Sequence, residues 1–172
     1  GLEIDADFKV SEKISIRSNA AFSTNKNQDF RASVNGNLQD LGDTNLSFSP
    51  NMIVGNMFIF QPTNNFQVSF LSKFVGEQFM SNLNSSVSKL DVLDSYFTSD
   101  LNFVYEIETK SVFNTIVISG IINNIFNTEY VDRGNYYTYD YPDGSGNTVT
   151  GDGAGYYPQA TANFLLGLTL KF

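Results

Sequence analysis

The residues best suited to binding chemistry gather in one polar segment, YVDRGNYYTYDYPDGSGNTVTGDGAGYYP, which covers residues 130–158. Tyrosine combines a flat apolar ring with a hydroxyl group, which suits contact with a chelate, a sugar or a partner protein. The predicted ligand-binding residues are Tyr136, Tyr137, Tyr139, Asp140 and Tyr141. The alternative, and the more ordinary one, is a segment that folds on its own aromatic rings, Tyr156 and Tyr157 included.

The DGSGN stretch within that segment suggests a calcium loop, but its spacing does not fit one. Asp143, Ser145 and Asn147 suit the first three ligand positions of an EF-hand. Thr148 stands where the EF-hand needs glycine, and Ala154 stands where it needs glutamate. The sequence therefore predicts no metal site here, and the glycines are expected to provide turns.

The composition excludes several classes of function. The 172 residues include no Cys and no His, so thiolate nucleophiles, disulfides, imidazole bases and the usual zinc sites are missing. Eighteen acidic residues against ten basic ones give a formal charge of -8, which argues against a nucleic-acid partner. We expect neither an enzyme nor a bound cofactor.

The elements that must position these residues are strands, because apolar and polar residues alternate with a period of two in one segment after another. In LEIDADFKV, for example, every charge falls on one face and every apolar side chain on the other. The predicted strands cover residues 2–10, 14–22, 52–61, 66–79, 96–107, 113–127 and 161–172.

Five carboxylates lie on the polar faces of these strands: Glu3, Asp5, Asp7, Asp100 and Glu106. They could guide a cationic substrate or contact a basic neighbouring domain. The commoner reason for such residues is a hydrated wall, because a polar inner face is general among β-barrels.

The connections between the strands alternate in length, with short turns after the first, third and fifth strands. The other three connections are the long polar segments 24–51, 80–95 and 128–157. This pattern predicts an all-β fold, an antiparallel transmembrane β-barrel whose apolar face contacts lipid and whose polar face surrounds the lumen. Only a closed ring of strands satisfies every backbone group in hydrocarbon, and bacterial barrels have even strand numbers. We therefore expect further strands before residue 1.

Three stretches resemble segments of TonB-dependent outer-membrane receptors, particularly those of Bacteroidetes. GIINNIFNTEY resembles the NLFNxxY segment near the end of these proteins, and YYPQATANFLLGLTLKF resembles their terminal strand. FQPTNNFQVSFLSKFVGEQF is similar to their proline-containing periplasmic turn and the strand after it. The resemblance implies that residues 1–172 are the C-terminal part of a 22-stranded barrel, its last seven strands, with the plug domain and earlier strands outside this chain.

The end of the chain resembles the signal read by the barrel assembly machinery, in which Gly167, Leu170 and Phe172 fit the pattern. Leu165 departs from it, because a polar residue is expected there. Phe172 could also sit in the aromatic girdle at the bilayer interface, and both roles can hold together.

The resemblance implies a bacterial outer-membrane transporter that takes up a scarce nutrient by energised plug displacement. A ferric siderophore is the most frequent cargo in the family, and oligosaccharide, peptide and cobalamin are others. The implied partners are outer-membrane lipid, the TonB system through the missing N-terminal part, the assembly machinery and a surface lipoprotein. The alternatives are a barrel fragment that acts as a receptor or as a folding substrate held by the assembly machinery, and a soluble β-sandwich binding module.

Overall fold

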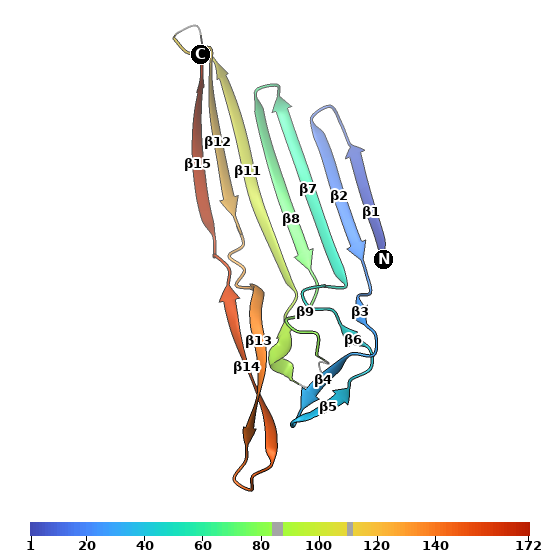
Figure 1. Ribbon diagram of the computed structural model, residues 1–172. Coiled ribbons are helices and arrows are strands. Elements are labelled where there is room, and N and C mark those ends of the chain that lie inside the picture. Colours follow the sequence, from blue (N-terminus) through green and yellow to red (C-terminus); the bar gives the residue numbers. More distant parts are fainter. Residues whose placement is uncertain (84–87, 110–111) are drawn as a thin grey trace.

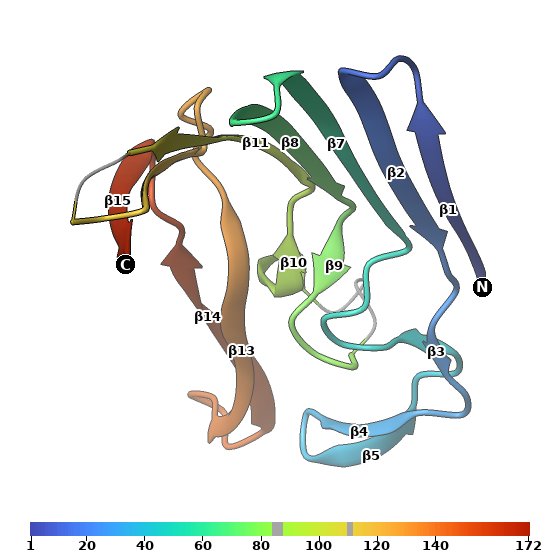
Figure 2. The same cartoon turned by 90° about the horizontal axis from the view of Figure 1, so that it is seen from above.

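The computed structural model describes residues 1–83, 88–109 and 112–172 and is dominated by one curved antiparallel sheet (Figures 1 and 2). Neighbouring strands of this sheet follow one another along the chain. In order they are β1 (Leu2–Lys9), β2 (Ile14–Phe22), β7 (Met52–Thr63), β8 (Phe66–Val75), β11 (Tyr96–Glu108), β12 (Thr115–Asn123) and β15 (Asn163–Lys171). No helix in these three ranges is both long and apolar enough to cross a membrane.

All seven predicted strands are confirmed; two of them end four residues earlier than predicted, and the other ends differ by at most two residues. The strand predicted over 113–127 ends at Asn123, because Asn124 and Asn127 adopt left-handed backbone angles, φ 50° and 56°. The strand predicted over 66–79 ends at Val75, and residues Gln78–Phe79 form the separate short strand β9. The sheet is open in this chain, with β1 and β15 at its two edges.

The three long connections lie together at one end of the sheet and contain structure of their own (Figure 1). The first holds the pairs β3 (Lys26–Asn27) with β6 (Thr44–Asn45) and β4 (Arg31–Val34) with β5 (Asn37–Asp40). The second holds β9, the 3-10 turn η1 (Lys89–Asp91) and β10 (Val92–Leu93). The third is a long hairpin of β13 (Val131–Pro142) and β14 (Thr148–Pro158). We call these connections the loop end of the sheet.

The register of the sheet aligns side chains of neighbouring strands in cross-strand rows, each on one face of the sheet. One cross-strand row on the convex face is apolar from edge to edge: Phe8, Ile16, Phe58, Phe70, Leu101, Ile122 and Phe164. An adjacent row on the concave face runs through Asp7, Arg17, Met57, Leu71 and Asp100. A register slip of one residue in any strand would exchange these faces.

The convex face is uncovered. Leu2, Phe164 and Leu168 are 57%, 71% and 67% exposed, and in the described ranges no second sheet is stacked on them. A soluble β-sandwich needs such a second layer to bury this apolar surface. The β-sandwich alternative therefore has no support in the fold, and an exposed apolar face of this extent marks a contact with an apolar environment.

The turn after β12 explains why the NNIFN stretch has the residues it has. The side chain of Asn124, 4% exposed, donates to the carbonyl oxygens of Thr128 (2.8 Å) and Ala160 (3.3 Å) and accepts from the Thr128 amide (2.9 Å). Its backbone amide donates to the Asp100 carboxylate at 2.8 Å. One buried asparagine thus ends β12 and holds the chain just before β15.

We expect Asn124→Ala to lower the free energy of unfolding by about 2 kcal/mol. It leaves buried backbone groups without partners and places an alanine in the left-handed region. The measurement is urea unfolding of the detergent-folded protein. The matched control is Asn123→Ala, which removes an exposed hydrogen bond to Asn163 and should cost less than about 1 kcal/mol. Equal losses from both substitutions would contradict this role for Asn124.

Candidate functional site

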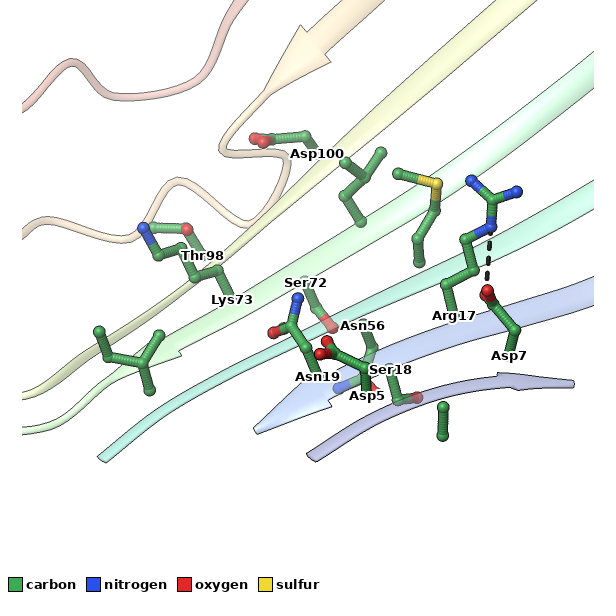
Figure 3. A pocket seen from close by; sticks show the side chains of 15 residues that line it. Asp5, Asp7, Arg17, Ser18, Asn19, Asn56, Ser72, Lys73, Thr98 and Asp100 are labelled. Carbon is green, nitrogen blue, oxygen red and sulfur yellow. Dashed lines mark ion pairs between the residues drawn. The ribbon is translucent and has the colours of Figure 1, made fainter. Parts of the chain in front are cut away.

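The concave face contains a groove of about 730 Å³ that crosses from β1 to β11 (Figure 3). Its lining includes three of the five predicted carboxylates, Asp5, Asp7 and Asp100. Arg17 pairs with Asp7 at 3.2 Å, and Lys73 lies beside Thr98 on the same wall, in the cross-strand row that begins at Asp5. The groove therefore carries both signs of charge.

The other two predicted carboxylates are not part of this groove. Glu3 lies opposite Ala21 at the loop end of β1, and Glu106 pairs with Lys171 at 3.4 Å near the other end of the sheet. Asp100 also stabilises the turn after β12, because its carboxylate accepts a hydrogen bond from the Asn124 amide. The alternating sequence pattern does not predict this role. The five carboxylates are thus spread over the wall rather than gathered into one site, and the exposed ion pairs contribute little stability.

The predicted tyrosines lie on both faces of the β13–β14 hairpin. Tyr137, Tyr139 and Tyr141 alternate along one face of β13, with ring centroids 6.3 Å and 5.9 Å apart. We call these three residues the tyrosine ladder. A Cβ atom built on Gly153 would lie 2.7 Å from the Tyr137 ring, and one built on Gly151 would lie 2.9 Å from the Tyr139 ring. The glycines opposite the ladder therefore leave the space into which these rings fold.

Tyr136 and Asp140 lie on the other face of the hairpin, which contacts the neighbouring connections. The Tyr136 hydroxyl donates to Asp152 at 3.2 Å, and burial raises the pKa of Tyr136. The Tyr156 hydroxyl donates to the carbonyl oxygen of Leu90 in η1 at 2.9 Å. The five residues predicted as one ligand site are therefore divided, with Tyr137, Tyr139 and Tyr141 on one face and Tyr136 and Asp140 on the other.

The tips of two hairpins meet across 115 residues of sequence. The Asn35 amide donates to Thr150 Oγ1 at 2.6 Å, and the Thr150 amide donates to Asn35 Oδ1 at 2.9 Å. Thr150 Oγ1 in turn donates to Asp140 at 2.5 Å. Asn35 and Gly36, with φ 53° and 73°, form the tight turn between β4 and β5. We call the reciprocal pair of Asn35 and Thr150 the tip contact.

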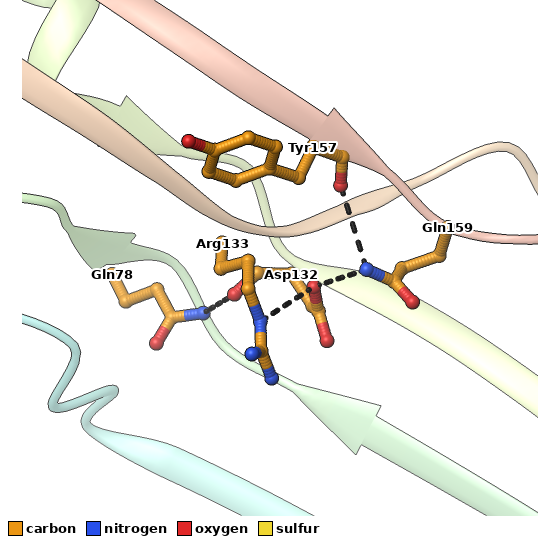
Figure 4. Close-up of polar contacts among 5 residues, drawn as sticks. All are labelled: Gln78, Asp132, Arg133, Tyr157 and Gln159. Carbon is orange, nitrogen blue, oxygen red and sulfur yellow. Dashed lines mark hydrogen bonds and ion pairs between the residues drawn. The ribbon is translucent and has the colours of Figure 1, made fainter.

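A polar cluster ties the base of the long hairpin to its surroundings (Figure 4). Gln159 Nε2 donates to the Asp132 carboxylate at 2.6 Å, and Arg133 pairs with the same oxygen at 3.5 Å. Gln78 Nε2 donates to the Asp132 carbonyl oxygen at 3.2 Å. The cluster coincides with a register shift between Val131 and Arg133, where the ladder of backbone hydrogen bonds is irregular.

The DGSGN stretch forms the turn at the tip of the long hairpin. Asp143 Oδ1 accepts from the amides of Ser145 and Asn147, both at 2.8 Å, and these bonds lower the pKa of Asp143. Gly146 has a positive φ of 83°, so this glycine adopts the turn conformation that was expected from the sequence. Among the described residues, no group of three or more acidic side chains could hold a metal ion.

Sequence reasoning missed one buried carboxylate. Asp91, 1% exposed, accepts from the amide and hydroxyl of Ser81, both at 2.7 Å, and burial raises its pKa. The two residues join the start and end of the connection 80–95. No pattern in this polar segment distinguishes Asp91 from its exposed neighbours, so the pairing could not be found from the sequence.

The three residues predicted as an assembly signal lie on the edge strand or just beyond it. Gly167 faces Ser119 of β12, and a Cβ atom at Gly167 would lie 2.6 Å from the Ser119 hydroxyl. Leu170 lies on the convex face, and Phe172 packs against Phe113 with 4.9 Å between ring centroids. Phe172 is still 80% exposed.

We expect Thr150→Val to weaken the tip contact by removing one of its two hydrogen bonds, because valine keeps the shape of threonine but cannot accept from the Asn35 amide. The Asn35 amide should exchange its hydrogen about fivefold faster, as loss of one hydrogen bond implies. Hydrogen-exchange mass spectrometry on peptides covering residues 33–37 measures this. Thr148→Val is the control, since the Thr148 methyl group next to Gly36 is retained. Unchanged exchange in Thr150→Val would show that the tips are held together by other contacts.

Comparisons with known proteins concern the fold. No protein-family model matches the sequence, and no curated protein matches it. Among solved structures, the siderophore receptor PiuA from Acinetobacter baumannii is similar with a TM-score of 0.58 and 10% identity over 97% of this chain. A variant of the ferric enterobactin receptor PfeA from Pseudomonas aeruginosa has a TM-score of 0.60 and 14% identity over 99% of this chain. The ferric-catecholate import receptor Fiu from E. coli K12 has a TM-score of 0.52 and 14% identity over 95% of this chain.

The chain spans 21%, 22% and 19% of these three receptor chains. At such low identity the similarity concerns the fold and not the ligand. The seven-stranded antiparallel sheet is therefore similar in fold to a part of these receptors.

Proposed function

We propose that this chain forms part of the wall and the outer loops of a TonB-dependent transporter in the bacterial outer membrane. The observation that carries the proposal is the convex apolar row, which crosses seven strands without interruption and has no protein layer over it. In hydrocarbon such a face is favourable, whereas in water it would favour aggregation.

The open edges of the sheet support a closed barrel of more strands. β1 and β15 each have one neighbour in the described sheet, so their outer backbone groups need further partners. Hydrocarbon offers none, and closure with additional strands satisfies them. We propose a 22-stranded barrel with a plug, the architecture of plugged outer-membrane transporters, and the concave groove would then face the plug.

The proposed cargo is a ferric siderophore, taken up when the energised TonB system displaces the plug. The support is the fold shared with receptors whose names state siderophore, enterobactin and catecholate ligands. The loop end, with its long tyrosine-rich hairpin, is the proposed outer face. The barrel assembly machinery, acting on Gly167, Leu170 and Phe172, and a surface lipoprotein are further proposed partners, and their support is the resemblance of the sequence to TonB-dependent receptors.

A second candidate is a barrel that acts as a receptor, or a fragment held by the assembly machinery. The open edge of β15 favours it, because an unpaired edge strand can pair with a strand of another protein. Energised uptake distinguishes the two candidates, since a receptor or a captured fragment would bind without transport.

Membrane insertion can be tested with neighbouring residues on opposite faces of β7. We expect Phe58→Lys, on the convex face, to destabilise the protein in lipid vesicles by about 2–4 kcal/mol, the cost of lysine near the bilayer midplane. Met57→Lys, on the concave face, should cost less because its ammonium group reaches the groove. The measurement is the folded fraction across a urea series, read from heat-modifiable gel mobility. Equal tolerance of both lysines would contradict a lipid-facing convex surface.

Uptake can be tested in iron-starved cells with and without the protein. We expect cells that contain it to accumulate iron from at least one ferric siderophore, and a proton-conducting uncoupler to abolish this difference. Scintillation counting of radioactive iron measures both. Binding to the cell surface with no energised accumulation would favour the receptor alternative. Recovery of the protein in the soluble fraction would contradict the membrane location.

A further inference from the structure

The negative charge of the chain is concentrated at the loop end. Residues 23–51, 76–95 and 124–162 contain eleven acidic and four basic residues, a net charge of -7 out of the total of -8. The strands and short turns contain seven acidic and six basic residues and are nearly neutral. A ligand that approaches the loop end therefore meets a negative potential, which attracts cations and repels anions.

The long hairpin is the most acidic of these connections and carries the tyrosine ladder. Residues 124–162 contain Glu129, Asp132, Asp140, Asp143 and Asp152 against the single base Arg133, which is paired with Asp132, and all of these acidic residues except Glu129 lie within the hairpin. Asp140 and Asp152 lie on the face opposite the ladder, so they set the potential without occupying its surface.

The ladder is open to a ligand. Tyr137, Tyr139 and Tyr141 are 54%, 52% and 45% exposed, and the rings of Tyr137 and Tyr139 lie over Gly153 and Gly151 of β14. The face of an aromatic ring attracts cations, and neighbouring negative charges add to this attraction. The ladder thus combines flat apolar contact area with a preference for positive charge.

The acidic hairpin and the exposed tyrosine rings favour a positively charged ligand, whereas a ferric catecholate, the ligand class named for one of the similar receptors, is negatively charged. A ferric tris-catecholate carries three negative charges, because each catecholate contributes two against the three positive charges of the iron. A ferric tris-hydroxamate is neutral at its metal centre, and it becomes a cation where its backbone ends in a free ammonium group. Lysine and arginine side chains make the strongest hydrogen bonds to anions, and the hairpin offers one arginine, which is already paired with Asp132.

We propose that the tyrosine ladder binds a cationic ligand and that the cargo is a ferric hydroxamate chelate with a free ammonium group, not a tris-catecholate. The identity of the cargo rests on the proposed uptake function. The preference of the ladder for a positive charge rests on the geometry and the charge distribution alone.

The test compares three chelates of the same metal with the detergent-solubilised protein. These are a ferric tris-hydroxamate with a free ammonium group, the same chelate with that group acetylated, and a ferric tris-catecholate. We expect the ammonium form to bind about threefold more tightly than the acetylated form, as an exposed cation–π contact implies. This difference should shrink at 1 M salt, where charges are screened within about 3 Å. Isothermal titration calorimetry measures all three affinities.

Variants separate the ladder from general charge effects. Tyr139→Ala should reduce the preference for the ammonium form, and Tyr139→Phe, which keeps the ring, should retain it. Asp152→Asn should reduce the preference for the ammonium form, because it removes a nearby negative charge while leaving the three tyrosines unchanged. Thr138→Ala, on the opposite face, is the control and should change nothing.

Two results would overturn the inference. Equal binding of the ammonium and acetylated forms, or tighter binding of the tris-catecholate, would show that the ladder does not select a cation. Tris-catecholate uptake by cells in the same experiment would leave the proposed transport function standing while this inference fails. Loss of energised uptake for every chelate, with the ammonium preference intact in calorimetry, would remove the transport function but not the preference of the ladder.

Discussion

The hydrogen-bond register of the seven-stranded sheet is the constraint on which the other features depend. Because side chains alternate along each strand, one register places Phe58 on the convex face and Met57 on the concave face in line with their neighbours. The apolar row, the charged groove and the location of the long connections all follow from it. The β7–β8 pairing shifts register between Phe60 and Thr63, where Pro62 has no backbone amide to donate.

The main sheet could be predicted from the sequence because alternation is a local signal. The segment LEIDADFKV shows its two faces without reference to any other part of the chain, and β1 has the predicted polarity. The predicted end of β12 at residue 127 lies four residues too late. Ile125 and Phe126 continue the apolar pattern, but the backbone has already turned at Asn124. Backbone angles of single asparagines are not visible in a hydrophobic pattern.

The loop end could be predicted only in outline. Its polar composition identified the connections, but the way in which the connections contact one another depends on residues far apart in sequence, such as Asn35 and Thr150. The tyrosines were recognised as a group, whereas their division between two faces follows from the pairing of Tyr137 with Gly153 and Tyr139 with Gly151. The tyrosine ladder therefore has a structural explanation, the filling of space above glycines, that is compatible with ligand contact.

The tip contact has a consequence for how such chains can change in length. The hairpin β4–β5 follows β2, the hairpin β13–β14 follows β12, and the two hairpins contact each other at Asn35 and Thr150. A deletion of two residues from one arm would preserve its own pairing but leave the partner residue on the other arm facing solvent. Insertions and deletions in these two segments should therefore be inherited together, so that the reach of one arm remains matched to that of the other.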